Sequence, residues 1–273
     1  MIKNLSFIVN THSSMQDIWP LFTHYLNKYL SKSKIYILSD IKSKYFSNFK
    51  TLIYDKNLDF TSQYLNSLNK VKEDYCITLN DDYFLNGRVN FKEINRFKSL
   101  LEKNNRISFI RLFKCDTHNY TNIEIDKNLF LINPNMRNIY SQSATLWNKD
   151  HLKDLYVKSP KGFIGKKGKL NNTQKKFNLC TEDEVDKVAL KNNVLGLYSY
   201  YGEKKKGYSF YESRVLPHLN SVIIGGEWNF IEYRNELENI FNRHKFDNKR
   251  NIVRSNYKDK IYSFLKKIFK YHY

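Results

Sequence analysis

The 273-residue sequence contains little cysteine and no long apolar run. Its three cysteines, Cys76, Cys115 and Cys180, lie far apart and form no CxxC pair, so they indicate neither a zinc site nor a disulfide framework. No segment approaches the ~18 apolar residues of a membrane helix, and the apolar run from Leu5 to Val9 is too short for a signal peptide. These absences predict a cytoplasmic protein with reduced cysteines.

Negative charge is also scarce, because 27 Asp and Glu residues stand against 46 Lys and Arg and leave a net charge of +19. The excess favours an anionic partner such as nucleic acid, an anionic membrane or a phosphorylated substrate. Codon bias in an AT-rich genome accounts for the same lysine-rich composition equally well. A hydrophobic fraction of 41% and an aromatic fraction of 16% indicate a folded globular chain, and its length suits one large domain or two small ones.

Short apolar runs alternate with segments of helical periodicity in the first half of the sequence. The apolar runs predict buried strands, and the periodic segments predict amphipathic helices. Strands that alternate with helices predict an α/β fold with a mixed, mostly parallel sheet covered on both faces. The predicted strands are 5–9, 35–38, 51–54 and 75–79, and the predicted helices are 16–30 and 61–72.

The second half of the sequence is less regular. We predict further strands at 107–112, 129–132, 194–198 and 222–224 and further helices at 148–156 and 182–191. The basic, glycine-containing segment 158–178 lacks the GxxxxGK[ST] spacing of a Walker motif and is typical of a mobile, solvated loop. We predict one domain over residues 1–245 and a basic amphipathic helix within 246–273. This helix could lie on an anionic membrane, pack on its own domain or pack on a second copy of the chain in a homodimer.

Asn80, Asp81 and Asp82 follow the predicted strand at 75–79 and precede another apolar run. Two adjacent carboxylates repel each other unless a cation or strong hydrogen bonds compensate. Mg2+ and Mn2+ bind oxygen ligands of this kind and commonly bridge them to a substrate's phosphates. An ordinary loop start, in which the aspartates cap a turn, is the alternative. The apolar flanks favour an enclosed site, and the carboxyl ends of parallel strands are where ligands bind.

The stretch ITLNDDYF, residues 77–84, resembles glycosyltransferases of the GT-A fold, in which a strand ends in an acidic DxD motif. In that family the motif holds a metal ion and the diphosphate of a nucleotide sugar. Asn80 stands where the family has its first Asp. The resemblance implies a single GT-A-like, Rossmann-like domain, a UDP- or GDP-linked donor, and a Mn2+ or Mg2+ ion held first by Asp82 and second by Asp81.

The opening FIVNTHSS and the later IYILSD resemble the nucleotide-binding strand ends of the same family. By this resemblance Thr11, His12 and Asp40 approach the base and ribose, while Asn80 and Asp81 complete the nucleotide-sugar site. Polar residues that merely end a strand are the alternative for each of these positions.

Two later stretches, SQSATLWNKDHLKDL and CTEDEVDKV, resemble the acceptor half of several bacterial glycosyltransferases. The resemblance implies a sugar platform at Trp147 and a catalytic base among Glu182, Asp183 and Glu184. An inverting transfer needs such a carboxylate to deprotonate the attacking hydroxyl. A capping box of Thr181 and Glu184 is the alternative use of Glu184, which leaves Asp183 as first choice and Glu182 as second. Trp147 is alternatively a core residue.

His218 precedes an apolar run and the pair Gly225-Gly226. Several GT-A enzymes use a late histidine as a metal or diphosphate contact, so the resemblance implies His218 as a further metal ligand. A core or surface histidine is the alternative. The two glycines permit a tight turn or a close backbone approach.

The leading hypothesis is a glycosyltransferase of polysaccharide biosynthesis that transfers a sugar to a hydroxyl of a glycan or lipid-linked acceptor. It would work in the cytoplasm or against the inner face of the membrane, with no nucleic acid partner. A basic nucleic-acid-binding protein is the second hypothesis, favoured by the charge and the many aromatic residues, although no nucleic-acid-binding motif occurs. A GT-A-like domain that binds a glycan without catalysis is the third.

Overall fold

The computed structural model describes residues 2–115, 120–135, 138–159, 181–202, 204 and 208–253, with the backbone alone described at 181–183. The chain forms two compact units, Met1–His218 and Leu219–Tyr273. The predicted basic loop lies outside the described residues from residue 160 on, and the predicted C-terminal helix does so from residue 254 on. The predicted boundary between residues 245 and 246 stays a prediction. No helix in the described ranges is long and apolar enough to span a bilayer.

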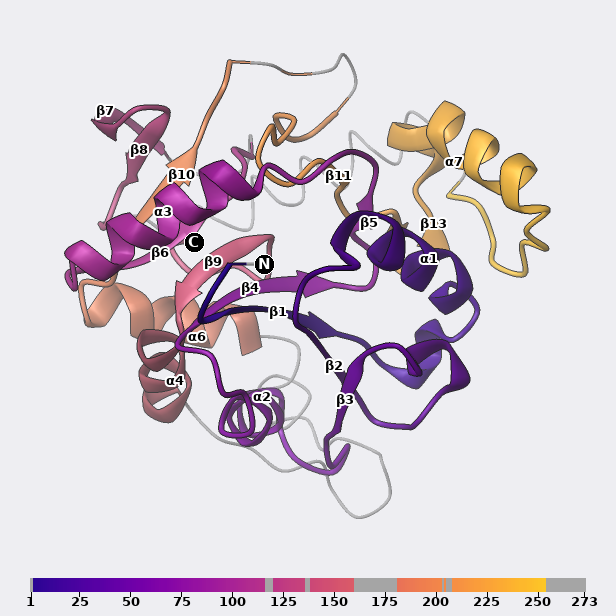
Figure 1. Cartoon of the computed structure of the whole chain (residues 1–273), viewed down its shortest axis with the longest axis horizontal. Coiled ribbons are helices and arrows are strands. Elements are labelled where there is room, and N and C mark those ends of the chain that lie inside the picture. The colour runs from indigo at the N-terminus through magenta and orange to yellow at the C-terminus, as the bar shows by residue number, and fades with distance from the viewer. Residues whose placement is uncertain are drawn as a thin grey trace, which may run out of the picture. The chain divides into compact units, whose positions relative to one another are not determined.

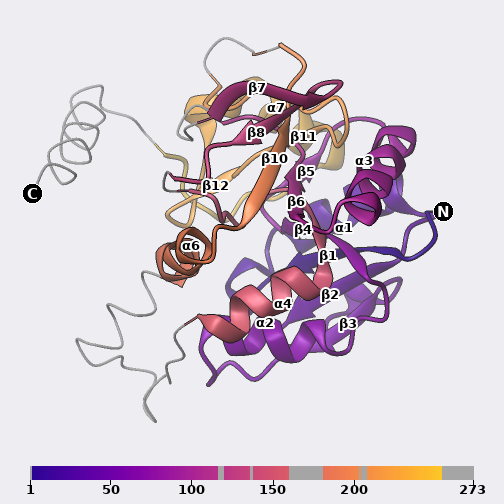
Figure 2. The same ribbon diagram turned by 90° about the vertical axis from the view of Figure 1, so that its left-hand side faces the viewer.

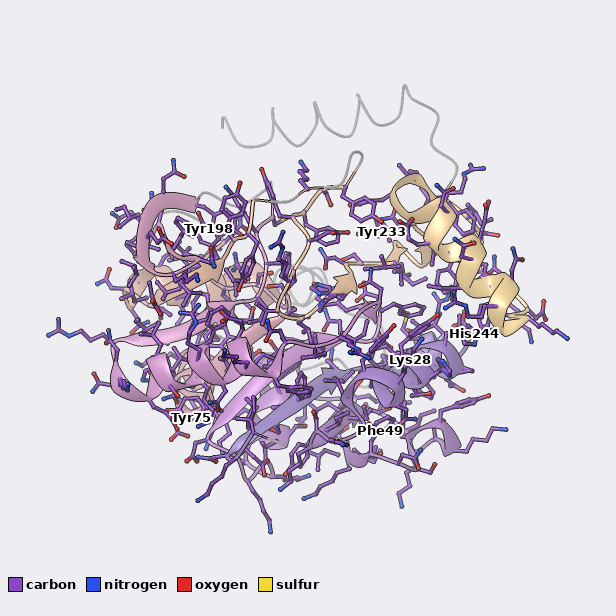
Figure 3. All side chains as sticks on the ribbon, turned by 45° about the horizontal axis from the view of Figure 1, so that its top comes forward. Lys28, Phe49, Tyr75, Tyr198, Tyr233 and His244 are labelled. Carbon is purple, nitrogen blue, oxygen red and sulfur yellow. The ribbon has the colours of Figure 1, made fainter. Side chains whose placement is uncertain are left out.

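A nine-stranded sheet forms the centre of the first unit, in the order β3-β2-β1-β4-β9-β6-β10-β8-β7 (Figure 1). β8 and β9 run against the other strands, which all point the same way, so the predicted mixed, mostly parallel α/β sheet is confirmed. Phe49, beside β3, and Tyr198, in β10, lie toward opposite ends of the sheet (Figure 3). The strands are β1 (Leu5–Asn10), β2 (Ile35–Ser39), β3 (Lys50–Ile53), β4 (Tyr75–Asn80), β6 (Ile107–Arg111), β7 (Tyr120–Asp126), β8 (Leu129–Ile132), β9 (Thr145–Asn148) and β10 (Leu195–Ser199).

Helices cover both faces of this sheet (Figure 2). α2, α4 and α6 pack side by side on one face, over a core that includes Ile8, Cys76, Phe109 and Trp147. α1 and α3 cover the other face (Figures 1 and 2). These helices are α1 (Trp19–Leu30), α2 (Phe60–Leu68), α3 (Phe91–Lys103), α4 (Lys149–Lys158) and α6 (Thr181–Lys191).

Most of the predicted elements are confirmed within a few residues of their bounds. The helix predicted at 16–30 begins only at Trp19. Residues 13–15 before it form a 3-10 turn, in which the His12 side chain accepts a hydrogen bond from the backbone N–H of Ser14. α3 is absent from the predicted elements, although Ile94, Phe97 and Leu101 are buried at helical spacing. β7 and β9 are likewise unpredicted. The side chains of β7 are largely exposed and follow no buried alternation.

The second unit, taken by itself, contains the hairpin of β12 (Ile223–Ile224) and β13 (Glu227–Trp228), followed by α7 (Phe230–His244). Gly225 and Gly226 form the hairpin turn with φ values of 60° and 87°, which confirms the predicted tight turn. Trp228 packs on the ring of Phe241 at 4.8 Å between ring centroids. The described ranges also contain the short strands β5 (Phe84–Leu85) and β11 (His218–Leu219), the second of which spans the boundary of the units.

Candidate functional site

β1 and β4 form the place where the strand order of the sheet reverses. From β1 the chain moves outward to β2 and β3, and it then returns to β4 on the other side of β1. In open α/β sheets, ligands bind in the crevice beyond the carboxyl ends of the strands at such a reversal. Asn10 and Asn80 are in register, so the polar residues that follow both strands lie at one edge of the sheet. The topology therefore brings two of the predicted polar clusters together.

Asp81 is buried at this edge and binds the end of β1. The hydroxyl of Thr11 donates a hydrogen bond to the Asp81 carboxylate. The indole N–H of Trp19, at the start of α1, lies 2.7 Å from the Thr11 hydroxyl and 3.4 Å from the same carboxylate. A buried carboxylate needs donors of this kind, because an unpaired buried charge is costly. Asp81 therefore ties β1, β4 and α1 together, a structural role that its position in the sequence does not reveal.

Asp82 is only partly buried, and its carboxyl has a shifted pKa. Burial, with a further contribution from the negative charge of Asp81, raises the pKa of the Asp82 carboxyl from 3.8 to about 8. Within the described part of the chain no Lys, Arg or His forms an ion pair with Asp82. A cation bound here would favour the ionised carboxylate and so relieve the conflict of charge. Asp82 is thus the more exposed aspartate of the pair, and its binding of a ligand stays a prediction.

Asp40 follows β2 and binds the turn after β1. Ser13 donates its backbone N–H at 2.7 Å and its hydroxyl at 2.6 Å to the two oxygens of the Asp40 carboxylate. Nε2 of His12 lies 3.4 Å from the same carboxylate, and 53% of the His12 side chain is exposed. Thr11, His12 and Asp40 thus lie together as predicted from the strand ends, with His12 the most accessible. Their contact with a nucleotide stays a prediction.

Asn80 connects the end of β4 to a distant loop. Its side-chain amide donates to the carbonyl of Gln142 at 3.1 Å. The same loop is held from the other side by Asp186 of α6, whose carboxylate accepts the backbone N–H groups of Asn138 at 2.7 Å and Tyr140 at 2.9 Å. The acid pair and α6 are therefore joined through one loop. Asp186 stands one helical turn after the predicted base positions Glu182 and Asp183, and no motif in the sequence marks it.

The predicted bases lie in the first turn of α6, which begins at Thr181. The side chains at 181–183 lie outside the described residues, so the roles of Glu182 and Asp183 stay predictions. Glu184 forms an ion pair with Lys187 at 2.6 Å along the helix, which is a local use of its carboxylate.

Trp147 lies in β9 with 1% of its surface exposed. Its ring packs on Phe109 at 4.5 Å and on Tyr140 at 6.1 Å between centroids. A ring buried in this way presents no face to an acceptor sugar. The structure places Trp147 in the core under α2 and α4, which is the alternative that the sequence leaves open, and not at an exposed platform.

His218 is buried in an aromatic cluster beside the acid pair. Its ring stacks on Tyr83, the residue after Asp82, at 5.3 Å, and it also contacts two phenylalanine rings. Burial lowers the pKa of His218 to about 4, so the ring is neutral at pH 7. Nδ1 lies 2.6 Å from the Leu216 carbonyl and carries the hydrogen, while the buried Nε2 has no hydrogen-bond partner in the described chain. An unprotonated ring nitrogen can bind a metal, and that role of His218 stays a prediction.

A cavity of about 300 Å³ lies next to His218. Its lining is formed by Asn86, Glu212, Ser213, Arg214, Pro217 and His218. Glu212 and Arg214 place a carboxylate and a guanidinium in this cavity, which suits a polar ligand. Sequence reasoning misses both residues, because the segment around them has neither helical nor strand periodicity and matches no motif.

The described residues could hold a divalent cation only if oxygen atoms of a substrate supplied the other ligands. In the described ranges, no three His, Cys, Asp or Glu side chains gather closely enough to hold a metal ion by themselves. Mg2+ and similar ions are commonly bound through one or two carboxylates, with phosphate oxygens of the substrate completing the shell. Asp82 beside Asp81 is a donor set of that type. The structure is thus compatible with a Mn2+ or Mg2+ ion that arrives with a diphosphate.

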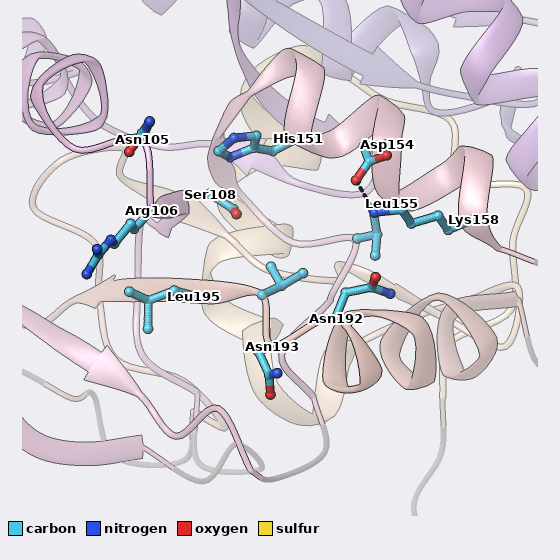
Figure 4. Close-up of a pocket in the computed structure, with 11 residues that line it drawn as sticks. Asn105, Arg106, Ser108, His151, Asp154, Leu155, Lys158, Asn192, Asn193 and Leu195 are labelled. Atoms are coloured by element: carbon cyan, nitrogen blue, oxygen red, sulfur yellow. Dashed lines mark hydrogen bonds and ion pairs between the residues drawn. The ribbon is translucent and has the colours of Figure 1, made fainter.

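A second pocket, of about 260 Å³, lies at the opposite edge of the sheet (Figure 4). It is formed by α4 and the amino ends of β6 and β10, and an ion pair of Asp154 with Lys158 at 2.6 Å lies in its wall. Its lining consists of Asn105, Arg106, Ser108, His151, Asp154, Leu155, Lys158, Asn192, Asn193, Val194 and Leu195. None of the predicted site residues is among them, so this pocket is separate from the site at the strand reversal.

No family model matches the sequence, and no curated protein matches it. Solved structures align with the chain at low scores. UDP-glucose pyrophosphorylase complexed with UDP-glucose aligns at 8% identity over 73% of this chain and 92% of that chain, with a TM-score of 0.43. S. aureus TarS 1-349 in complex with UDP aligns at 14% identity over 76% of this chain and 59% of that chain, also with a TM-score of 0.43. CMP:2-keto-3-deoxy-manno-octonic acid synthetase complexed with CTP aligns at 8% identity over 71% of this chain and 88% of that chain, with a TM-score of 0.40. At these identities and scores, a function has to be argued from the site of this chain itself.

Proposed function

We propose that the chain is a glycosyltransferase that takes a sugar from a nucleotide sugar and transfers it to a hydroxyl of a glycan or lipid-linked acceptor. The observation that supports this most is the position of Asp82, beside Asp81, at the reversal of strand order. Open α/β sheets bind nucleotides at such a reversal. A carboxyl whose pKa is raised by burial and a neighbouring charge is typical of a functional site.

The donor would lie over the carboxyl ends of β1, β2 and β4. His12 is exposed there and can contact the base or ribose, whereas Thr11 and Asp40 are engaged within the protein and shape the edge. Asp82 would hold a Mn2+ or Mg2+ ion together with the diphosphate, and His218 is a further contact for either. The ion would offset the negative charge that develops on the departing diphosphate.

The acceptor hydroxyl needs a carboxylate base, which we place at Asp183 or Glu182. α6 leads directly into β10, so its first turn lies toward the carboxyl ends of the strands. One turn further along, Asp186 binds the loop that Asn80 also holds. Asp186 itself is occupied by two backbone N–H groups, which leaves the earlier acids for catalysis.

Thermal unfolding with UDP- and GDP-linked sugars, each with and without Mn2+, tests the proposal. We expect one donor to raise the unfolding midpoint in a metal-dependent way, with a gain of about 2.7 kcal/mol at 100 times its Kd. Asp82→Ala should abolish this gain, and the matched control Asp247→Ala, at an exposed acid of the second unit, should keep it.

The proposal fails if no nucleotide sugar stabilises the wild type. Binding of random oligonucleotides that salt disrupts would then favour the nucleic-acid-binding hypothesis, which the net charge of +19 motivates. For the base, Asp183→Asn should abolish transfer while donor binding persists, and retained transfer would remove Asp183 from that role.

A further inference from the structure

Lys114 lies in a group of tyrosine rings just beyond the carboxyl end of β6. Its ammonium nitrogen is 4.5 Å from the ring centroid of Tyr200 and 5.2 Å from that of Tyr211. These two rings stand at 89° to each other, so they form a corner around the nitrogen. The centroids of the Tyr120 and Tyr198 rings, which pack on each other at 4.0 Å, each lie 5.8 Å from the same nitrogen. We call Lys114, Tyr200 and Tyr211 the lysine corner.

The ammonium group of Lys114 contacts aromatic rings. Four other lysines pair with carboxylates in ion pairs, namely Lys34, Lys98, Lys158 and Lys187. Within the described part of the chain, no carboxylate forms such a pair with Lys114. A cation is attracted to the face of an aromatic ring, but a ring does not accept its hydrogen bonds in the way the oxygen of an anion does. The charge and the N–H donors of Lys114 therefore remain available to an anionic ligand.

A second cation lies close to the lysine corner. The ammonium nitrogen of Lys204 is 5.5 Å from the centroid of the same Tyr211 ring. The Tyr211 ring is thus a contact of two lysine side chains, Lys114 and Lys204.

The lysine corner lies at the same edge of the sheet as the acid pair. Tyr200 directly follows the carboxyl end of β10, as Lys114 follows that of β6. The backbone N–H of Tyr211 donates to the carbonyl of Lys114 at 2.8 Å. From Tyr211 the chain passes along the cavity of Glu212 and Arg214 to His218, whose ring stacks on Tyr83. The segment 211–218 thus runs from the lysine corner to His218, which contacts Tyr83, the residue after Asp82.

The strands at which the two sites lie suggest a different ligand for each site. The nucleotide end is formed by β1, β2 and β4, and the lysine corner lies beyond β9 at the ends of β6 and β10. A group bound there is therefore separated from the nucleotide and belongs with the acceptor. Partly exposed tyrosine rings offer flat apolar surface with a polar tip, which suits a sugar ring better than an extended apolar chain.

We propose that the lysine corner binds an anionic group, a phosphate or a carboxylate, of a carbohydrate acceptor whose sugar ring packs on Tyr200 and Tyr211. The acceptor class is then an anionic glycan and not a neutral one. That the ligand is an acceptor rests on the proposed function, whereas the anion site itself depends only on the contacts of Lys114.

Calorimetric titration with three probes tests the inference: glucose 6-phosphate, glucuronate and, as neutral control, glucose. The variants are Lys114→Met, Lys114→Arg and the matched control Lys70→Met, an exposed lysine at the other edge of the sheet. We expect Lys114→Met to weaken binding of an anionic probe about tenfold, which is about 1.4 kcal/mol. Lys114→Arg and Lys70→Met should leave it within a factor of about two, which is about 0.4 kcal/mol. The phosphate and carboxylate probes show which anion the site prefers.

Equal binding of the anionic probes by wild type and Lys114→Met would overturn the inference. So would loss of the donor-dependent thermal shift in Lys114→Met, because Lys114 would then hold the donor's phosphates. If Lys114→Met does not fold, Lys114→Gln, which retains a polar tip and part of the stem, provides the same comparison. Absence of any donor shift in the wild type, with probe binding that still depends on Lys114, would refute the proposed function and leave the anion site standing.

Discussion

Replacing Asp82 by Asn removes one ionisable group from the acid pair and keeps the size and polarity of the side chain. In the native protein, burial and the charge of Asp81 raise the pKa of Asp82 from 3.8 to about 8. At a pH between these two pKa values, Asp82 holds a proton in the native state that it has released in the unfolded chain. The contribution of Asp82 to stability is therefore most favourable at low pH and is lost as pH rises toward about 8. One such proton lowers the free energy of unfolding by about 1.4 kcal/mol per pH unit.

We expect the unfolding free energy of Asp82→Asn, relative to wild type, to rise by up to about 1.4 kcal/mol per pH unit from pH 5 to pH 7. This slope is the upper value, because solvent screens a carboxyl that is partly exposed. Urea unfolding followed by circular dichroism at pH 5, 6 and 7 measures the difference. Asp247→Asn, at an exposed acid, is the matched control. A constant difference between Asp82→Asn and wild type over this range would refute the reasoning.

The variant Asp82→Asn also tests whether a cation binds at Asp82. Mn2+ favours the ionised carboxylate, so Mn2+ with a bound donor at pH 7 should stabilise the wild type and release a proton. Asp82→Asn should lose most of this gain. An equal gain in both proteins would place the cation away from Asp82.

Three further substitutions test the packing around the site. Thr11→Val should lower the free energy of unfolding by about 1 to 3 kcal/mol, because the buried Asp81 carboxylate loses a donor; chemical denaturation measures this, and an unchanged midpoint would contradict the contact. Gly196→Ala would place a Cβ 2.1 Å from the Phe109 ring, so we expect a loss of about 1 to 3 kcal/mol or failure to fold, and a wild-type thermal midpoint would argue against this packing. Asp186→Ala should lower the free energy of unfolding by about 1.5 to 3 kcal/mol and speed hydrogen exchange at the two backbone N–H groups that donate to its carboxylate. Unchanged exchange at these N–H groups would show that Asp186 does not anchor the loop.

Local patterns predicted the α/β class and most of the central elements. The runs at 5–9, 35–38 and 75–79 are mostly apolar and are followed by polar residues, which is the pattern of strands buried on both faces. α3 and β7 escaped prediction for different reasons. The helical spacing of Ile94, Phe97 and Leu101 is present in the sequence of α3, so this helix was predictable, whereas β7 exposes most of its side chains and has no buried alternation to detect.

The sequence predicted which polar strand ends would lie together, but not the contacts that each polar group makes. The acids after β4 and the polar residues after β1 and β2 do lie at one edge, as the parallel topology requires. The sequence ranked Asp82 before Asp81 as a metal ligand, but it could not show that Thr11 and Trp19, which are distant in the chain, bind Asp81. It likewise left Trp147 open between a sugar platform and the core, and burial decides for the core.

The sequence by itself determined that short buried strands end in carboxylates, amides and a histidine, because strand and turn signals depend on neighbouring residues. Only the tertiary structure decided what each of these groups touches. It buried Asp81 against Thr11, 70 positions away, and left Asp82 partly exposed with its pKa raised. It also stacked His218 on Tyr83 and placed Lys114 among tyrosines from separate segments. The physical reason is that burial and the electric field at a group depend on all residues packed around it, whatever their separation along the chain.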